Sequence, residues 1–261
     1  MTLEARGIHA RIGKKEILQE IDFVAQAGQI TAIVGPNGSG KSTLLKAITD
    51  EVDFTGRVTL NGQDCATLRP WELAAIRGVL PQAATLAFPF TVIEVVRMGL
   101  QTGISGARVD IPMRALAAVG LDGYGGRFYQ ELSGGEQQRA QLARVMCQVW
   151  HPVVDGVPRW LLLDEPVASL DIGHQLLVMQ LVKDYATRGG GVVAVMHDLN
   201  LSAMFADQMT MILDGKVLIS DLPSVVMRDA ILSMAYSCQL RVNTQPAPGQ
   251  SFILPHLAIN H

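Results

Sequence analysis

Nine consecutive residues have the spacing of a loop that binds phosphate groups. The run G-P-N-G-S-G-K-S-T fits the pattern G-x-x-x-x-G-K-[ST], and it lies between the apolar, β-branched run 30–34 and the helix-like run 44–48. Its glycines let backbone N–H groups surround phosphate oxygens. We therefore predict a triphosphate site in which Lys41 contacts the β- and γ-phosphates and Ser42 holds Mg²⁺. The complete loop comprises Gly35, Pro36, Asn37, Gly38, Ser39, Gly40, Lys41, Ser42 and Thr43.

Two adjacent carboxylates follow another apolar run. Residues 160–163 are typical of a strand buried on both faces, and Asp164 and Glu165 stand at its carboxyl end. Open parallel sheets bind ligands at this edge. Asp164 is expected to complete the Mg²⁺ sphere through water, because Mg²⁺ keeps several of its waters. Glu165 is expected to be the general base that activates the attacking water.

A third motif, L-S-G-G-E-Q-Q-R at 132–139, places a hydroxyl group and accessible backbone N–H groups at the start of a helix. A helix start attracts anions, because its N–H groups and its dipole both favour negative charge. We expect Ser133, Gly134, Gly135 and Glu136 to meet a phosphate group.

Two single residues stand at further strand ends. Gln82 follows the strand-like run 78–81, and His197 follows the run 192–196. The Gln82 amide can reach Mg²⁺ or the attacking water, and a neutral His197 imidazole can hydrogen-bond the γ-phosphate or orient that water. Taken alone, each residue is also compatible with a purely structural role.

The composition limits the class of protein. The 261 residues are 49% hydrophobic, enough for a large core, and the formal net charge of -3 argues against a nucleic-acid partner, whose binding favours a basic surface. No apolar run approaches the roughly 20 residues of a membrane-spanning helix, and the N-terminus lacks a signal-peptide core. Cys65, Cys147 and Cys238 have no paired spacing for zinc or disulfides. We expect a protein of the reducing cytoplasm.

Strand-like and helix-like runs alternate along most of the chain, which predicts an α/β fold. Between about 83 and 143 the β character disappears, and this segment is expected to be a helical insert. Strands are expected at 3–10, 17–24, 30–34, 57–60, 160–163, 192–196, 209–213 and 216–219, and amphipathic helices at 91–100 and 111–119.

Together these motifs resemble the nucleotide-binding subunit of ABC transporters over nearly the whole chain. Walker A, the Q-loop glutamine, the signature at 132–137, Walker B, the D-loop at 169–171 and the switch histidine occur in the family's order. The resemblance implies ATP and Mg²⁺ as ligands, with ATP hydrolysis. It also implies a head-to-tail dimer, in which Ser133, Gly134 and Gly135 of one copy close on the γ-phosphate bound to Lys41 of the other. Asp171 would bridge the two copies.

The resemblance further implies a P-loop NTPase cassette with a RecA-like core sheet, an antiparallel β subdomain and an inserted helical subdomain. The expected boundaries are one domain over 1–261, an α/β core at 1–82 and 144–240, a helical signature subdomain at 83–143 and a tail at 241–261.

The partners follow from the same resemblance. It implies a second copy of the chain, two transmembrane permease subunits and, indirectly, a periplasmic substrate-binding protein, without nucleic acid. It also implies a peripheral position at the cytoplasmic face of the bacterial inner membrane. The helical subdomain is the expected docking surface, since Gln82 links it to the γ-phosphate. Its apolar contact candidates, about half of which we expect in the core, are Phe88, Phe90, Val92, Val95, Val96 and Met98.

One position departs from the family pattern. Family members usually place an aromatic residue near the first strand to stack on adenine, and the register of the first strand puts Ala10 there. His9 and Arg11 are the alternatives that this register leaves open. An Ala10→Tyr substitution is accordingly expected to tighten ATP binding by at most ~1 to 3 kcal/mol.

The cargo rests on finer resemblance. The runs 88–99, 169–175 and 196–206 are similar to the iron-chelate, haem and cobalamin importer branch, and the long segment 149–159 is similar to that of haemin-import ATPases. Haem is therefore the expected cargo. Siderophore or cobalamin import, and a soluble ABC ATPase such as the iron–sulfur assembly type, remain alternatives.

Overall fold

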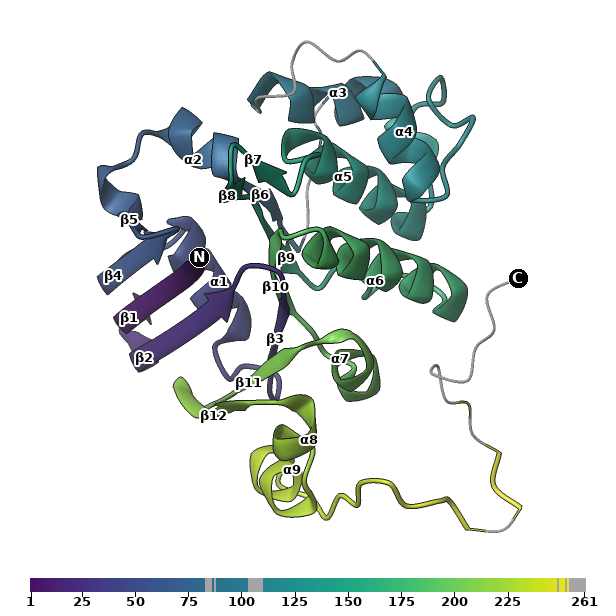
Figure 1. Ribbon diagram of the computed structural model, residues 1–261. Coiled ribbons are helices and arrows are strands. Elements are labelled where there is room, and N and C mark those ends of the chain that lie inside the picture. Colours follow the sequence, from purple (N-terminus) through teal and green to yellow (C-terminus); the bar gives the residue numbers. More distant parts are fainter. Residues whose placement is uncertain (83–85, 87, 103–109, 248, 252, 254–261) are drawn as a thin grey trace.

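A six-stranded, mostly parallel sheet forms the centre of the molecule in the computed structural model (Figure 1). Its strand order is β12-β11-β3-β10-β9-β6, and only the edge strand β12 is antiparallel to its neighbour. The strands are β3 (Ile30–Val34), β6 (Arg77–Leu80), β9 (Trp160–Asp164), β10 (Gly191–Val195), β11 (Gln208–Leu213) and β12 (Lys216–Asp221). Every residue of β3, β9 and β10 is buried, as expected for apolar strands covered on both faces.

The structure describes residues 1–82, 86, 88–102, 110–247, 249–251 and 253. Parts of the expected helical segment 83–143 and of the expected tail 241–261 therefore lie outside the described residues.

A second, antiparallel sheet lies to one side of the central sheet (Figure 1). Its order is β2-β1-β4-β5, with β1 (Thr2–Ile12), β2 (Lys15–Gln26), β4 (Phe54–Leu60) and β5 (Gln63–Asp64). The β1–β2 pairing shifts register three times, between Ala5 and Ile8, between Ile8 and Ala10, and between Ala10 and Arg11. Such irregularities change which side chains face the core.

Helices cover both faces of the central sheet. Helix α1 packs between the two sheets. Its apolar side chains share one buried cluster with residues of β1 and β2 on one side and of β9 and β10 on the other. The other face is covered by α5, α6 and α7, with α3 and α4 stacked beyond α5 (Figure 1). The helices are α1 (Lys41–Thr49), α2 (Pro70–Ile76), α3 (Val92–Thr102), α4 (Ile111–Ala118), α5 (Gly134–Gln148), α6 (Ile172–Thr187), α7 (Leu199–Phe205), α8 (Pro223–Val226) and α9 (Asp229–Tyr236).

The long segment 149–159 contains a small hairpin that is not among the expected strands. Strands β7 (Val153–Val154) and β8 (Val157–Pro158) pair around Asp155 and Gly156, which both have positive φ. An Asp-Gly pair favours this tight turn. The hairpin is tied to its surroundings by the Pro158 carbonyl, which accepts from Asn61, and by Arg159, which donates to the Ala75 carbonyl.

The expected α/β fold class is confirmed. The apolar runs at 30–34, 160–163 and 192–196 are strands of the central sheet, while the runs at 91–100 and 111–119 correspond to α3 and α4. Within the part of the chain that the structure describes, no helix is both long enough and apolar enough to cross a bilayer.

Candidate active site

The glycine-rich loop joins β3 to α1, so that the first turn of α1 faces the loop. Gly35 has φ +144°, and a Cβ there would lie 2.1 Å from the Ile212 carbonyl oxygen. Only glycine therefore lets the loop begin directly against β11. The α1 N-cap is Gly40, and the first turn of α1 contains no acidic side chain. The helix start thus offers its N–H groups and its dipole to an anion.

Lys41 is held by the loop that it follows. Its side-chain ammonium group donates to the carbonyl oxygens of Gly35 and Pro36, each at 2.9 Å. Only 5% of the residue is exposed, and this burial lowers the pKa of Lys41, against the opposing attraction of Glu165 and Asp164. The cation is thereby positioned before any phosphate arrives.

Ser42 and Asp164 form an oxygen pair that fits Mg²⁺. The Ser42 hydroxyl donates to Oδ1 of Asp164 at 3.0 Å. Asp164 is 3% exposed, and burial raises the pKa of its carboxyl group although the Ser42 hydrogen bond acts in the opposite direction. A buried carboxylate beside a hydroxyl is the hard-oxygen donor set that Mg²⁺ prefers.

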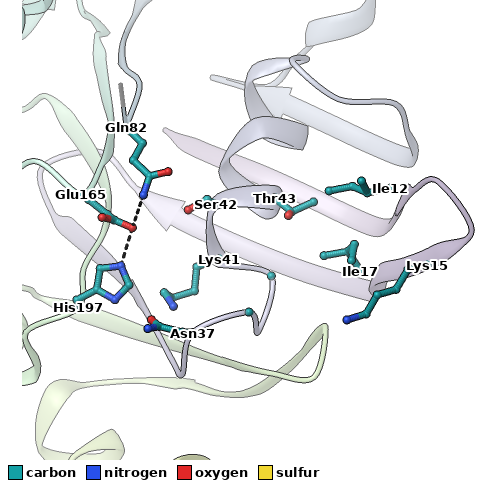
Figure 2. A pocket seen from close by; sticks show the side chains of 12 residues that line it. Ile12, Lys15, Ile17, Asn37, Lys41, Ser42, Thr43, Gln82, Glu165 and His197 are labelled. Carbon is teal, nitrogen blue, oxygen red and sulfur yellow. Dashed lines mark hydrogen bonds and ion pairs between the residues drawn. The ribbon is translucent and has the colours of Figure 1, made fainter. Parts of the chain in front are cut away.

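Three polar side chains from three segments converge beside Lys41. Gln82 donates through Nε2 to Oε1 of Glu165 at 3.0 Å, and Nε2 of His197 lies 2.6 Å from the same oxygen. Figure 2 shows both side chains pointing at Glu165 from opposite sides. Because Gln82, Glu165 and His197 follow β6, β9 and β10, the parallel order of these strands brings them to one edge.

These groups surround a cavity of about 580 Å³. Its volume lies in the range typical of small-molecule and cofactor sites. The cavity is lined by nine of the site residues predicted from the sequence: Asn37, Gly38, Gly40, Lys41, Ser42, Thr43, Gln82, Glu165 and His197. Of the other loop residues, Ser39 is buried and Gly35 lies against β11.

The signature residues are not among those that line this cavity. Ser133 caps α5: its hydroxyl oxygen accepts from the Glu136 backbone N–H at 3.3 Å, and its own N–H donates to the Glu136 carboxylate at 2.8 Å. Hydrogen bonding of the Glu136 carboxylate to the backbone N–H of Ser133, and then to its side chain, holds the pKa of Glu136 below its ordinary value. Ser133 and Gly134 are exposed. Asp171, also exposed, caps α6 by accepting from the His174 backbone N–H at 2.9 Å.

The expected adenine position is wrong. Ala10 is buried in the core between the sheets, and His9 and Arg11 lie near Glu16 rather than in the cavity. The end of the cavity away from Glu165 is lined instead by Ile12, Lys15 and Ile17 (Figure 2). The register shifts in β1 explain the error, because simple alternation along the strand does not survive them.

The family model for ABC transporters matches residues 18–168. The chain belongs to the ABC transporter family, and it is an ABC-type ATPase with ATP as its nucleotide.

Among curated relatives, the chain is similar to the hemin import ATP-binding protein HmuV of Roseobacter denitrificans. The two are 60% identical over 258 residues, which is 99% of each chain. The protein of the same name from a Jannaschia species is 60% identical over 256 residues, covering 98% of this chain and 95% of that relative.

Solved structures agree on the fold. An ATP-binding subunit of an ABC transporter superposes with a TM-score of 0.77 at 20% identity, covering 91% of this chain and 98% of that one. A bacterial ABC transporter cassette solved as a dimer superposes with a TM-score of 0.74 at 26% identity, covering 85% and 98%.

Proposed function

We propose that this chain hydrolyses ATP to power haem import through a membrane permease. The observation that carries the ATPase part is the convergence of Lys41, Ser42 and Glu165 at one cavity. Asp164 does not line this cavity itself but is hydrogen-bonded to Ser42, which does. The cargo is supported by the 60% identity, over nearly the full length, to proteins named for hemin import.

The proposed reaction needs a base, a phosphate anchor and oriented donors. Glu165 takes a proton from the attacking water, whose oxygen bonds to the γ-phosphorus while the bond to the β–γ bridging oxygen breaks, giving ADP and phosphate. Lys41 and the N–H groups of the loop hold the phosphates. Gln82 and His197 keep the Glu165 carboxylate at the cavity through their contacts with Oε1. When bound by Ser42 and Asp164, Mg²⁺ would neutralise charge on the phosphate oxygens.

We further propose that the site is completed by a second copy of the chain. In one chain none of Ser133, Gly134 and Gly135 lines the cavity. Ser133 and Gly134 are exposed at the start of α5, and Gly135 is half-buried beside them. A head-to-tail dimer would bring this helix start to the γ-phosphate of the partner. The related cassette solved as a dimer supports this arrangement.

The helical subdomain proposed over 83–143 would be the surface for two permease subunits, which would hold the chain at the cytoplasmic face of the inner membrane. Phe88 is 68% exposed, and Met113 and Phe128 are also exposed. Val92, Val95 and Val96 are fully buried, so these three docking candidates belong to the core instead. The exposed apolar side chains of Phe88, Met113 and Phe128 support an interaction surface here, because exposed apolar patches mark such surfaces.

The docking surface can be tested with Phe88→Asp, which should reduce co-purification with the permease while leaving ATP hydrolysis by the chain alone unchanged. Met204→Asp, at an exposed apolar position on α7, is the matched control. If the Phe88→Asp variant co-purifies with as much permease as the wild-type chain does, Phe88 is not part of the docking surface.

The cargo can be tested with the chain reconstituted with its permease in vesicles. Periplasmic binding proteins loaded with haem, a ferric siderophore or cobalamin are added separately, and ATP hydrolysis is measured. Stimulation by the haem-loaded protein is the expected result. If only the siderophore- or cobalamin-loaded protein stimulates hydrolysis, that ligand and not haem is the cargo. If hydrolysis responds to none of the three loaded proteins, a soluble ABC ATPase is favoured.

A further inference from the structure

The backbone of Glu165 has an unusual conformation that other residues must hold in place. Its φ is +53°, in the left-handed region that non-glycine residues rarely adopt. Its N–H donates to the Val195 carbonyl at 3.1 Å, and its own carbonyl oxygen accepts from the Ala168 N–H at 3.3 Å. These bonds fix the turn after β9, and therefore the direction in which the Glu165 carboxylate leaves the main chain.

A third hydrogen bond to this turn comes from the signature helix. Gln138, in the second turn of α5, donates through Nε2 to the Glu165 carbonyl oxygen at 2.6 Å. Its Oε1 accepts from the Ser169 N–H at 3.3 Å. One half-buried amide therefore holds both ends of the segment 165–169, which joins the candidate base to the D-loop.

The start of α5 also touches this segment directly. A Cβ on Gly135 would lie 2.9 Å from the Ser169 carbonyl oxygen. The helix start and the segment 165–169 are thus in close contact, so a displacement of one must move the other.

We propose that Gln138 is a positioning residue that couples the signature to the general base of the same chain. Resting on the proposed function, this means that the start of α5, bound to the partner's γ-phosphate, sets the orientation of the Glu165 peptide through the Gln138 amide. Hydrolysis at one site then depends on nucleotide at the other. Gln138 contacts neither nucleotide, so its removal should affect turnover and not ATP affinity.

Two substitutions separate the two bonds of this amide. Gln138→Met has a similar length and removes both hydrogen bonds, while Gln138→Glu keeps an acceptor for the Ser169 N–H and loses the donor to Glu165. Gln148→Met is the matched control, because Gln148 lies in the last turn of the same helix and donates to the Ala74 and Arg77 carbonyls, away from the nucleotide.

Each full-length variant is assayed for steady-state hydrolysis of Mg·ATP, for ATP affinity of the isolated chain and for thermal melting. We expect both Gln138 variants to lose about tenfold in kcat, with the dissociation constant for ATP within about twofold of wild type. The kcat of Gln148→Met should match wild type. The Hill coefficient for ATP should fall in the Gln138 variants only.

Wild-type kcat in Gln138→Met would overturn the proposal, as would losses of kcat and ATP affinity that simply follow the melting temperature. Loss of kcat in Gln138→Met but not in Gln138→Glu would also contradict it, because the donor to Glu165 would then be dispensable. Failure of the wild-type chain to hydrolyse ATP would instead overturn the proposed function.

Discussion

The two ends of the cavity are built by different means. At the phosphate end, buried or partly buried polar groups are already bonded: Lys41 to two loop carbonyls, Ser42 to Asp164, and Glu165 to Gln82 and His197. At the other end, Ile12 is 59% exposed and Lys15 is also exposed.

This difference indicates where binding energy and specificity arise. Charged groups whose partners fix them before the ligand arrives need little reorganisation, so the phosphate end should dominate both affinity and catalysis. Exposed aliphatic side chains offer the adenine ring of a nucleotide only weak, non-directional contact. Substitutions at the phosphate end should therefore have larger effects than substitutions at the other end.

The largest effect is expected at Glu165. Glu165→Gln keeps the size of the side chain but removes the base, so steady-state hydrolysis should fall by roughly 10² to 10⁴. ATP should still bind and should stabilise a dimer, which size-exclusion chromatography would detect. Normal turnover would remove Glu165 from the role of base.

A comparable block is expected from Ser133→Arg at the exposed start of α5. A large cation there would prevent the approach of a partner's nucleotide, so hydrolysis should fall by about 100-fold or more. ATP binding to the isolated chain should be intact, as measured by calorimetry. Impaired binding to single chains would mean that Ser133 serves the site of its own chain.

Lys41→Met should act mainly on binding. Losing a charge-assisted hydrogen bond should weaken ATP affinity by about 10- to 100-fold. The matched control is Lys46→Met, an exposed position in the last turn of the same helix. Equal losses in the two variants would show that net charge, and not the position of Lys41, controls affinity.

The smallest effect is expected at the end of the cavity lined by Ile12, where we propose that adenine binds. Ile12→Tyr should tighten ATP binding about fivefold, near the low end for stacking of an aromatic ring on a base. Arg11→Tyr, at the neighbouring exposed position outside the cavity lining, should leave the dissociation constant unchanged. An unchanged constant in Ile12→Tyr would show that the base does not lie against this strand.

The phosphate end could be read from the sequence, because its residues stand at the ends of short apolar strands. The runs at 30–34, 160–163 and 192–196 have one structural solution, a buried parallel sheet, and that solution brings Lys41, Glu165 and His197 to one edge.

The end of the cavity lined by Ile12 could not be predicted in this way. Its position depends on register shifts in β1, which a single sequence does not reveal. Simple alternation therefore points to Ala10, whereas Ile12 lines the cavity. The Gln138 bonds also escaped prediction, because they join segments 27 and 31 residues apart through one rotamer. The hairpin at 153–158 did have a readable signal, its Asp-Gly turn.

The central claim is that two chains share each catalytic site, and mixing two inactive variants tests it most directly. In a head-to-tail dimer of Glu165→Gln with Ser133→Arg, one site carries both defects and the other carries neither. Mixing the chains before ATP is added should therefore restore measurable hydrolysis, up to about a quarter of the wild-type rate at equal amounts, since about half of random dimers are mixed and each has one intact site. The rate should fall below this limit to the extent that the intact Glu165 depends on the blocked signature of its own chain. No recovery at any mixing ratio would contradict the shared site.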